Sequence, residues 1–123
     1  MNALDKADAL KERTKQFAIR IVAVSRSLPR SREGDVIGKQ LLRSGTAVAA
    51  NYRAVCRARS KAEFISKMGI VVEEADETVF WLELLGDAGL APAPKLALLL
   101  KEANELVAIC AASLRTAKNH KAS

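Results

Sequence analysis

The stretch from residue 41 to residue 67 constrains the fold most, because it leads from one predicted helix into the next with only a short basic joint between them. Its first half places small side chains on several sides of a helix, so a neighbouring helix can approach closer than the usual separation of roughly 8–10 Å. Gly45 costs roughly 1 kcal/mol of helix propensity relative to alanine, and close packing is the compensation we expect. Asn51 follows among apolar residues and needs a hydrogen-bond partner if it is buried. Ser60, three residues before Glu63, has the spacing of a capping box, which starts the next helix.

Apolar residues recur at helical spacing along the rest of the chain. Leu28-Pro29 ends the first such segment, since the residue before a proline is disfavoured in a helix, and Ser31 is suited to cap the second segment. Gly89 lies in the longest connection and is suited to a positive φ. We therefore expect four helices, over about residues 5–28, 32–58, 60–86 and 93–117.

Short connections make consecutive helices antiparallel. A chain of 123 residues fits one domain, so the prediction is an all-α fold in which residues 1–123 form a single up-down-up-down, antiparallel four-helix bundle. Cys56 and Cys110 fall on apolar helix faces and are expected to be small core residues. The other residues expected to point into the core are Leu10, Phe17, Ile21, Val24 and Leu28, then Ile37, Leu41, Val48, Tyr52 and Val55, then Phe64, Met68, Val71, Ala75, Leu82 and Leu85, and then Leu96, Leu99, Ala103, Leu106 and Leu114.

The segment 79–82 in the third helix is apolar nearly all round the helix axis. At about 100° per residue, Phe80 and Leu84 fall almost opposite the inner stripe, with Ile70 toward the same side and Trp81 on a flank. A four-helix monomer cannot bury such an outer face, so the pattern indicates self-association. We therefore expect these four residues to lie at or beside an interface between the subunits of a homo-oligomer.

The positive charge is concentrated in the first half of the chain. Residues 1–67 hold 15 Lys and Arg against six Asp and Glu, a net +9, whereas residues 68–123 carry a net −3 of the total +6. Such asymmetry suits a polyanionic partner, and it equally suits subunits that meet basic face to acidic face. Our predicted contacts to a nucleic-acid backbone, at the joint between the second and third helices, are Arg53, Arg57, Arg59 and Lys61.

A resemblance to a known family rests on residues 41–85, which read LLRSGTAVAANYRAVCRARSKAEFISKMGIVVEEADETVFWLELL. The run resembles the bacterial four-helix-bundle family of 23S rRNA intervening-sequence proteins in Leu42-Arg43-Ser44-Gly45, in Ala50-Asn51-Tyr52-Arg53 and in the acidic-then-aromatic segment after Ser60. The resemblance implies an up-down bundle that assembles as a ring-shaped homopentamer. Accessory proteins of diversity-generating retroelements are similar bundles that bind nucleic acid and a reverse transcriptase. Through them the resemblance extends the expected partners to RNA, DNA and another protein.

No catalytic or metal-binding constellation stands out in the sequence. Glu73, Glu74, Asp76 and Glu77 suggest a dimetal carboxylate site, but such sites in bundles need Glu-x-x-His motifs, and the sole histidine is His120. We expect these carboxylates to pair with arginines of the second helix or of a neighbouring subunit, and we expect no metal and no cofactor. Nothing in the sequence points to a small-molecule ligand.

Arg115 and His120 have the arginine-x4-histidine spacing that resembles the motif of all-helical ribonucleases of the HEPN class, which leaves ribonuclease activity as a remote alternative. The pair lies near the chain end, where a general base is poorly held in place, so we predict that the protein is not an enzyme.

Residues 1–13 are charged and lack the apolar core of a signal peptide. Apolar runs such as residues 96–100 are too short to span a bilayer, so we expect a cytoplasmic protein with no membrane partner.

The function predicted from the sequence is that of a non-enzymatic, homo-oligomeric helical bundle that binds the backbone of RNA or DNA as an accessory module. The alternative is a purely structural or protein-binding ring, in which the basic residues serve contacts between subunits. Salt-sensitive binding to nucleic acid separates the two hypotheses.

Overall fold

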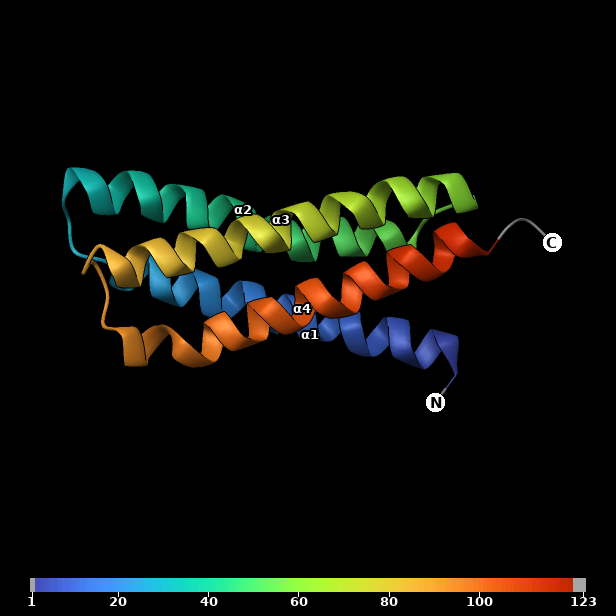
Figure 1. Cartoon of the computed structure of the whole chain (residues 1–123), viewed down its shortest axis with the longest axis horizontal. Coiled ribbons are helices and arrows are strands. Elements are labelled where there is room, and N and C mark those ends of the chain that lie inside the picture. The colour runs from blue at the N-terminus through green and yellow to red at the C-terminus, as the bar shows by residue number, and fades with distance from the viewer. Residues whose placement is uncertain (1, 121–123) are drawn as a thin grey trace.

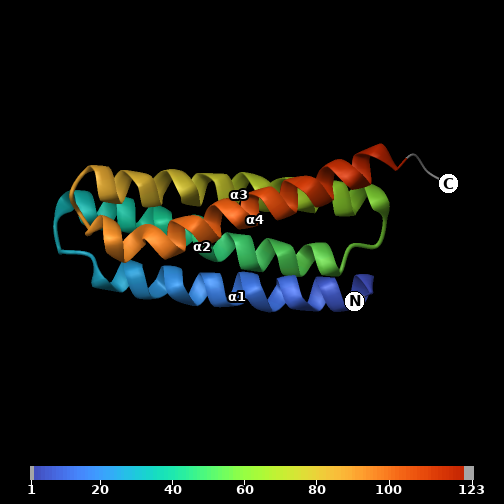
Figure 2. The same ribbon diagram turned by 60° about the horizontal axis from the view of Figure 1, so that its bottom comes forward.

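The computed structural model describes residues 2–120, in which four helices follow one another: α1 (Ala3–Ser27), α2 (Arg32–Cys56), α3 (Lys61–Asp87) and α4 (Ala93–Asn119). Each helix runs antiparallel to the one before it, and together they form a long bundle (Figure 1 and Figure 2). The predicted fold class, an all-α up-down-up-down four-helix bundle, is confirmed. Over the described range, no helix combines the length and the apolar character needed to cross a membrane.

Serine side chains start the second and third helices, as the sequence predicted. Ser31 Oγ accepts a hydrogen bond from the Gly34 amide at 2.9 Å, and Ser60 Oγ accepts one from the Glu63 amide at 3.0 Å. The Glu63 carboxylate does not complete a reciprocal capping box, because it lies instead toward the Arg59 guanidinium, with Oε2 at 4.0 Å from Nε. The hydroxyl of a single serine therefore sets where each of these helices begins.

The joint between α2 and α3 is tight. The amides of Arg57 and Ala58 donate to carbonyl oxygens three residues back, at 3.1 Å and 3.0 Å, so the last turn of α2 narrows to the spacing of a 3₁₀ helix. At the next joint, Gly89 has the expected positive φ, of 72°. Short, tightly wound joints keep the ends of neighbouring helices close together.

Buried side chains follow the predicted inner stripes closely. Three buried residues that the apolar pattern did not indicate carry hydroxyl groups, namely Thr14, Ser44 and Thr78. Thr78 Oγ1 lies 2.9 Å from Ser44 Oγ, so two of these hydroxyls satisfy each other across α2 and α3. The predicted core residues that are only partly buried are Leu10, Leu28, Ile37, Phe64 and Leu114. The buried apolar residues are Phe17, Ile21, Val24, Leu41, Val48, Tyr52, Val55, Met68, Val71, Ala75, Val79, Leu82, Leu85, Leu96, Leu99, Ala103, Leu106 and Cys110.

The predictions for one asparagine and for the two cysteines have different outcomes. Asn51 is half-buried, and its Nδ2 donates to the Ala47 carbonyl oxygen at 2.9 Å, so the expected hydrogen bond is confirmed. Cys110 is buried, but the prediction was wrong for Cys56, which is exposed. Cys56 lies about 40° round the helix from Tyr52, at the edge of the apolar stripe. At the last residue of α2, that displacement is enough to leave the thiol outside the core.

Close packing between α1 and α2 occurs at Gly45, as predicted. A Cβ atom on residue 45 would lie 2.7 Å from both Cγ1 and Cγ2 of Ile21. Ile21 is completely buried, and a β-branched side chain in a helix has one strongly preferred rotamer. The missing side chain of Gly45 therefore provides the space that Ile21 occupies.

The contact between α1 and α4 is the thinnest in the bundle, and the two helices separate toward the N-terminus of α1 (Figure 1 and Figure 2). Arg13 of α1 joins them, because its Nε and Nη2 each donate to the Glu102 carboxylate at 2.7 Å, and Nη2 also donates to Glu105 at 2.8 Å. The Arg13 guanidinium holds the pKa of the Glu102 carboxyl below its usual value. A bidentate pair of this kind fixes one helix against the other more specifically than a point charge does.

Two helical glycines provide a matched test of the α1–α2 packing. Nothing lies within 4 Å of a Cβ atom on Gly69, so we expect Gly69→Ala to stabilise the protein by about 0.5–1 kcal/mol through helix propensity. Gly45→Ala forces Ile21 or the backbone of α1 to move, and we expect a net loss of about 1–2 kcal/mol. Urea unfolding of both variants at one protein concentration measures the two changes. Equal stabilities for the two variants would contradict the close contact.

Candidate nucleic-acid interface and assembly face

Three of the predicted contact residues, Arg53, Arg57 and Arg59, lie together along the seam between α2 and α3. The surface is hollowed there, with a volume of about 410 Å³, because alanines of α2 leave space between the long basic side chains. The hollow is lined by Ala50, Arg53, Ala54, Arg57, Arg59, Glu63 and Lys67.

A second hollow, of about 540 Å³, follows the seam between α1 and α2. It is lined by Lys11, Glu12, Lys15, Thr46, Ala49, Ala50, Arg53 and Arg57. Ala50, Arg53 and Arg57 line both hollows, so the two adjoin on the surface of α2. We name the cationic residues of the two hollows the basic groove: Lys11, Lys15, Arg53, Arg57, Arg59 and Lys67.

The spacing of these cations in the sequence explains their alignment. Lys11 and Lys15 are four residues apart on α1, and Arg53 and Arg57 are four residues apart on α2, so each pair lies on one face of its helix. Since α1 and α2 are antiparallel neighbours, the two pairs form two rows, with the small side chain of Ala50 among them. The groove therefore has charged walls and a floor of small residues.

Carboxylates are few in the basic groove. Only Glu12 and Glu63 line the two hollows, and Glu63 is already close to Arg59, at 4.0 Å from Nε to Oε2. Within residues 2–120, Arg53 and Arg57 take part in no ion pair. Six cations against two carboxylates leave a positive surface that can concentrate an anion.

The lysines that line the basic groove differ from the lysine predicted to contact nucleic acid. Lys61 is exposed, but it lines a separate hollow at the start of α3, apart from Arg59. By contrast, Lys11, Lys15 and Lys67 line the groove although they were not among the predicted contacts. The signal that could have found the first two is their four-residue spacing, which places them on one helix face.

The outer side of α3 carries the residues predicted to lie at a subunit interface. Phe80 is 52% exposed, and Trp81 packs edge-on against it, with ring centroids 4.9 Å apart and an interplanar angle of 66°. Ile70 and Leu84 are half-buried and fall with the aromatic pair within an arc of about 100° round the helix. We name these four residues the α3 face.

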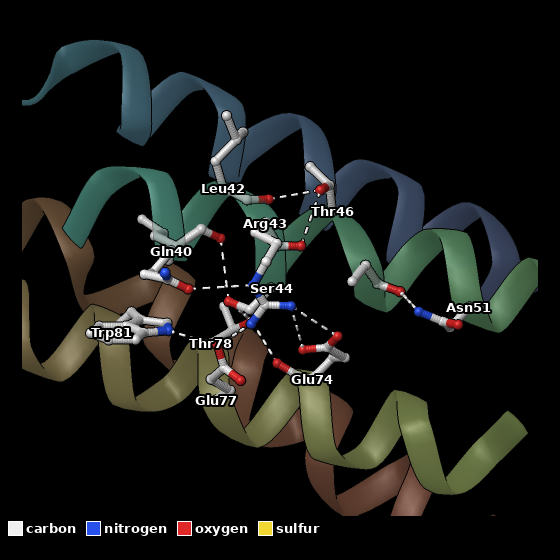
Figure 3. A network of polar contacts seen from close by, with 12 residues as sticks. Gln40, Leu42, Arg43, Ser44, Thr46, Asn51, Glu74, Glu77, Thr78 and Trp81 are labelled. Atoms are coloured by element: carbon white, nitrogen blue, oxygen red, sulfur yellow. Dashed lines mark hydrogen bonds and ion pairs between the residues drawn. The ribbon is translucent and has the colours of Figure 1, made fainter. Parts of the chain in front are cut away.

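A polar network between α2 and α3 lies beside the α3 face (Figure 3). Arg43 of α2 donates from Nη1 to both carboxylate oxygens of Glu74, at 3.1 Å and 3.2 Å, and from Nη2 to Glu77. Glu77 also accepts a hydrogen bond from Trp81 Nε1 at 3.0 Å. This hydrogen bond lowers the pKa of the Glu77 carboxyl most, and the Arg43 guanidinium lowers it further. Of the four carboxylates of α3 considered above, Glu74 and Glu77 are therefore confirmed to pair with an arginine of the second helix.

In the part of the chain that the structure describes, no three His, Cys, Asp or Glu side chains are grouped to hold a metal ion.

Arg115 and His120 are both exposed at the end of α4. The helix ends at Asn119, and His120 is the residue that follows it. Five residues correspond to about 140° round a helix axis, so side chains with this spacing leave α4 in different directions. Within residues 2–120, Arg115 and His120 form no hydrogen bond with each other.

Comparisons with known proteins cover most of the chain. Residues 8–112 match the family model described as 23S rRNA-intervening sequence protein. A crystal structure from Bacteroides thetaiotaomicron, of a protein with unknown function from the S23 ribosomal protein family, is 33% identical and has a TM-score of 0.82. This similarity covers 89% of the present chain and 98% of the other. No curated protein matches the chain. The family match includes both seams that form the basic groove.

Proposed function

The chain belongs to the 23S rRNA-intervening sequence protein family, and on that premise we propose that it is a non-enzymatic, self-assembling bundle that binds the phosphate backbone of nucleic acid. The observation that carries the proposal is the basic groove, in which cations of three helices adjoin over a floor of alanines. A strand laid along the α1–α2 seam meets two rows of cations, and the groove continues over the joint between α2 and α3. Such a surface binds nucleic acid chiefly by neutralising phosphates and releasing counterions.

The composition of the groove favours backbone contact over base reading. Contacts to phosphate position a protein on nucleic acid, whereas contacts to base edges supply sequence preference. In the described structure no aromatic side chain lines the groove, and Tyr52, next to Arg53 in the chain, is buried. A stacking platform for bases is therefore missing from the proposed surface. The family description names 23S rRNA, which makes RNA the first probe.

Neutralising the groove arginines tests the proposed binding surface. We expect Arg53→Gln/Arg57→Gln to lower the affinity for a labelled single-stranded RNA about tenfold at low salt. The slope of log affinity against log salt should fall in magnitude by about 1.4, since each lost phosphate contact removes roughly 0.7. Fluorescence anisotropy over a salt series, with RNA and DNA of several sequences, measures both quantities.

The matched control is Arg30→Gln/Arg32→Gln, which removes the same charge at the joint between α1 and α2. This joint is at the opposite end of the bundle (Figure 1). In the physiological part of the salt series, where charges are screened beyond about 8 Å, its arginines do not act on the groove. We expect the control to bind RNA nearly as the parent protein does. Equal losses in both variants would show only a response to net charge, and no binding of RNA or DNA at low salt would favour the purely structural ring.

We also propose that the α3 face is buried between subunits, in a ring-shaped pentamer of the kind that the family resemblance implies. The exposed aromatic pair supports this, since contiguous exposed apolar surface commonly marks an interface. The alternative ring uses charge: Glu73, Asp76 and Glu83 are exposed on the outside of α3 and could face the basic groove of the next subunit. In that arrangement the groove is occupied by protein and does not bind nucleic acid.

A charge placed on the α3 face tests the assembly. We expect Phe80→Asp to yield smaller species in light scattering, because a carboxylate cannot be buried unpaired in an apolar contact without a large desolvation penalty. Leu98→Asp is the control, since Leu98 is a 73% exposed apolar residue on α4. An unchanged mass for Phe80→Asp, or the same loss of mass in both variants, would refute the assignment of the interface.

A further inference from the structure

α1 and α4 separate toward one end of the bundle (Figure 1). Side chains of all four helices line a hollow at that end. Its volume is about 540 Å³, within the range of roughly 300–1,000 Å³ typical of small-molecule sites. Ala3 and Ala7 of α1 line it, and their short side chains do not fill the wedge between the two helices. We name this cavity the end hollow.

The walls of the end hollow are mainly apolar. They include Leu10 from α1, Phe64 and Met68 from α3, and Ile109 from α4. Ile109 is 38% exposed, whereas Met68 is only 1% exposed. The hollow therefore leads from the surface to the buried core, and an apolar molecule inside it would lose much of its contact with water.

Tyr52 places a polar group on this apolar wall. Its side chain is only 5% exposed and lines the hollow. The Cys56 thiol lies beside the hydroxyl and is a weak hydrogen-bond partner for it. Burial, and then the neighbouring Cys56 thiol, raises the pKa of the phenol, so it remains a hydrogen-bond donor at neutral pH. Buried tyrosine hydroxyls usually have a strong partner, and the hollow that Tyr52 lines has room for an acceptor stronger than a thiol.

Lys6 supplies a positive charge at the same hollow. Among the described residues it forms no ion pair, whereas Arg13, the other cation there, is held by Glu102 and Glu105. Lys6 also lies in the first turn of α1, where the helix dipole favours a negative charge. A ligand that carries an anionic group can thus be paired at the hollow.

We propose that the end hollow binds a small amphiphilic carboxylic acid, of the class of medium-chain fatty acids. The apolar chain lies against Leu10, Phe64, Met68 and Ile109, and its burial supplies most of the affinity. The carboxylate accepts a hydrogen bond from Tyr52 and pairs with Lys6, which selects an acid over a neutral molecule of the same shape. The site is separate from the basic groove and does not depend on nucleic-acid binding.

Titration calorimetry with decanoate, and with decanol as the matched molecule without a carboxylate, tests the proposal. We expect one decanoate per chain and affinity for decanol roughly tenfold weaker, since a hydrogen bond to a charged group is worth about 1.5–3 kcal/mol. Tyr52→Phe and Lys6→Met should each weaken decanoate binding roughly three- to tenfold. Both should change decanol binding much less, because a neutral hydroxyl accepts a weaker hydrogen bond from Tyr52 and forms no ion pair with Lys6. Lys101→Met, an exposed lysine of α4 outside the hollow, should behave as the parent protein.

Two further measurements keep these outcomes interpretable. Tyr52→Phe should unfold at a nearly unchanged temperature, because the hydroxyl that it removes has only the weakly bonding Cys56 thiol beside it, so its loss of affinity cannot be attributed to misfolding. Ile109→Trp should fill the hollow and abolish binding of both molecules while the circular dichroism stays helical. The proposal is overturned by no binding at millimolar decanoate, by equal affinity for decanoate and decanol, by parental affinity in Tyr52→Phe, or by retained binding in folded Ile109→Trp.

Discussion

The missing side chain at Gly45 is the constraint on which the basic groove depends. It lets α1 pack against α2 with Ile21 in the space that a Cβ atom would need. Further along the same seam α2 still presents small residues, Ala49 and Ala50, but α1 there presents lysines in place of an apolar side chain. The same run of small residues on α2 therefore allows tight apolar packing against Ile21 at Gly45, and it leaves a hollow lined by cations roughly one to two turns further along. A larger residue at position 45 would push the two rows of cations apart.

The position of α2 between α1 and α3 gives it a second role. Toward α3 it contributes Arg43, which holds Glu74 and Glu77, and Ser44, whose hydroxyl meets that of Thr78. Polar pairs at defined positions fix the rotation of α3 about its own axis more tightly than apolar packing alone. That rotation keeps the α3 face on the outside. The groove lies near the joint between α2 and α3 and the α3 face lies further along α3, so the proposed binding and assembly use different surfaces.

The elements of this fold could be predicted from the sequence because helical periodicity and capping are local properties. Ser60 and Gly89 act as their residue types indicate, and Gly45 does so because its propensity cost needs a compensating contact. The burial of Thr78 was not predicted, because a hydroxyl is buried at low cost only when a hydrogen-bond partner such as Ser44 lies opposite it on another helix. That partner depends on the tertiary structure and not on the local sequence. Lys61 follows Arg59 in the chain yet lies outside the groove, while Lys11 and Lys67 are brought into it by the packing of three helices. The end hollow was equally invisible, since it arises from the divergence of α1 and α4.

Lysine footprinting by mass spectrometry tests the central claim most directly, because the groove and the linear basic run assign different lysines to the contact surface. The protein is acetylated with and without saturating RNA at low salt, and the modification rate of each lysine is compared. We expect RNA to protect Lys11, Lys15 and Lys67, whereas Lys61 and Lys101 remain reactive. Protection of Lys61 with none at Lys11 and Lys15 would contradict the groove and favour contact through the interhelical joint alone.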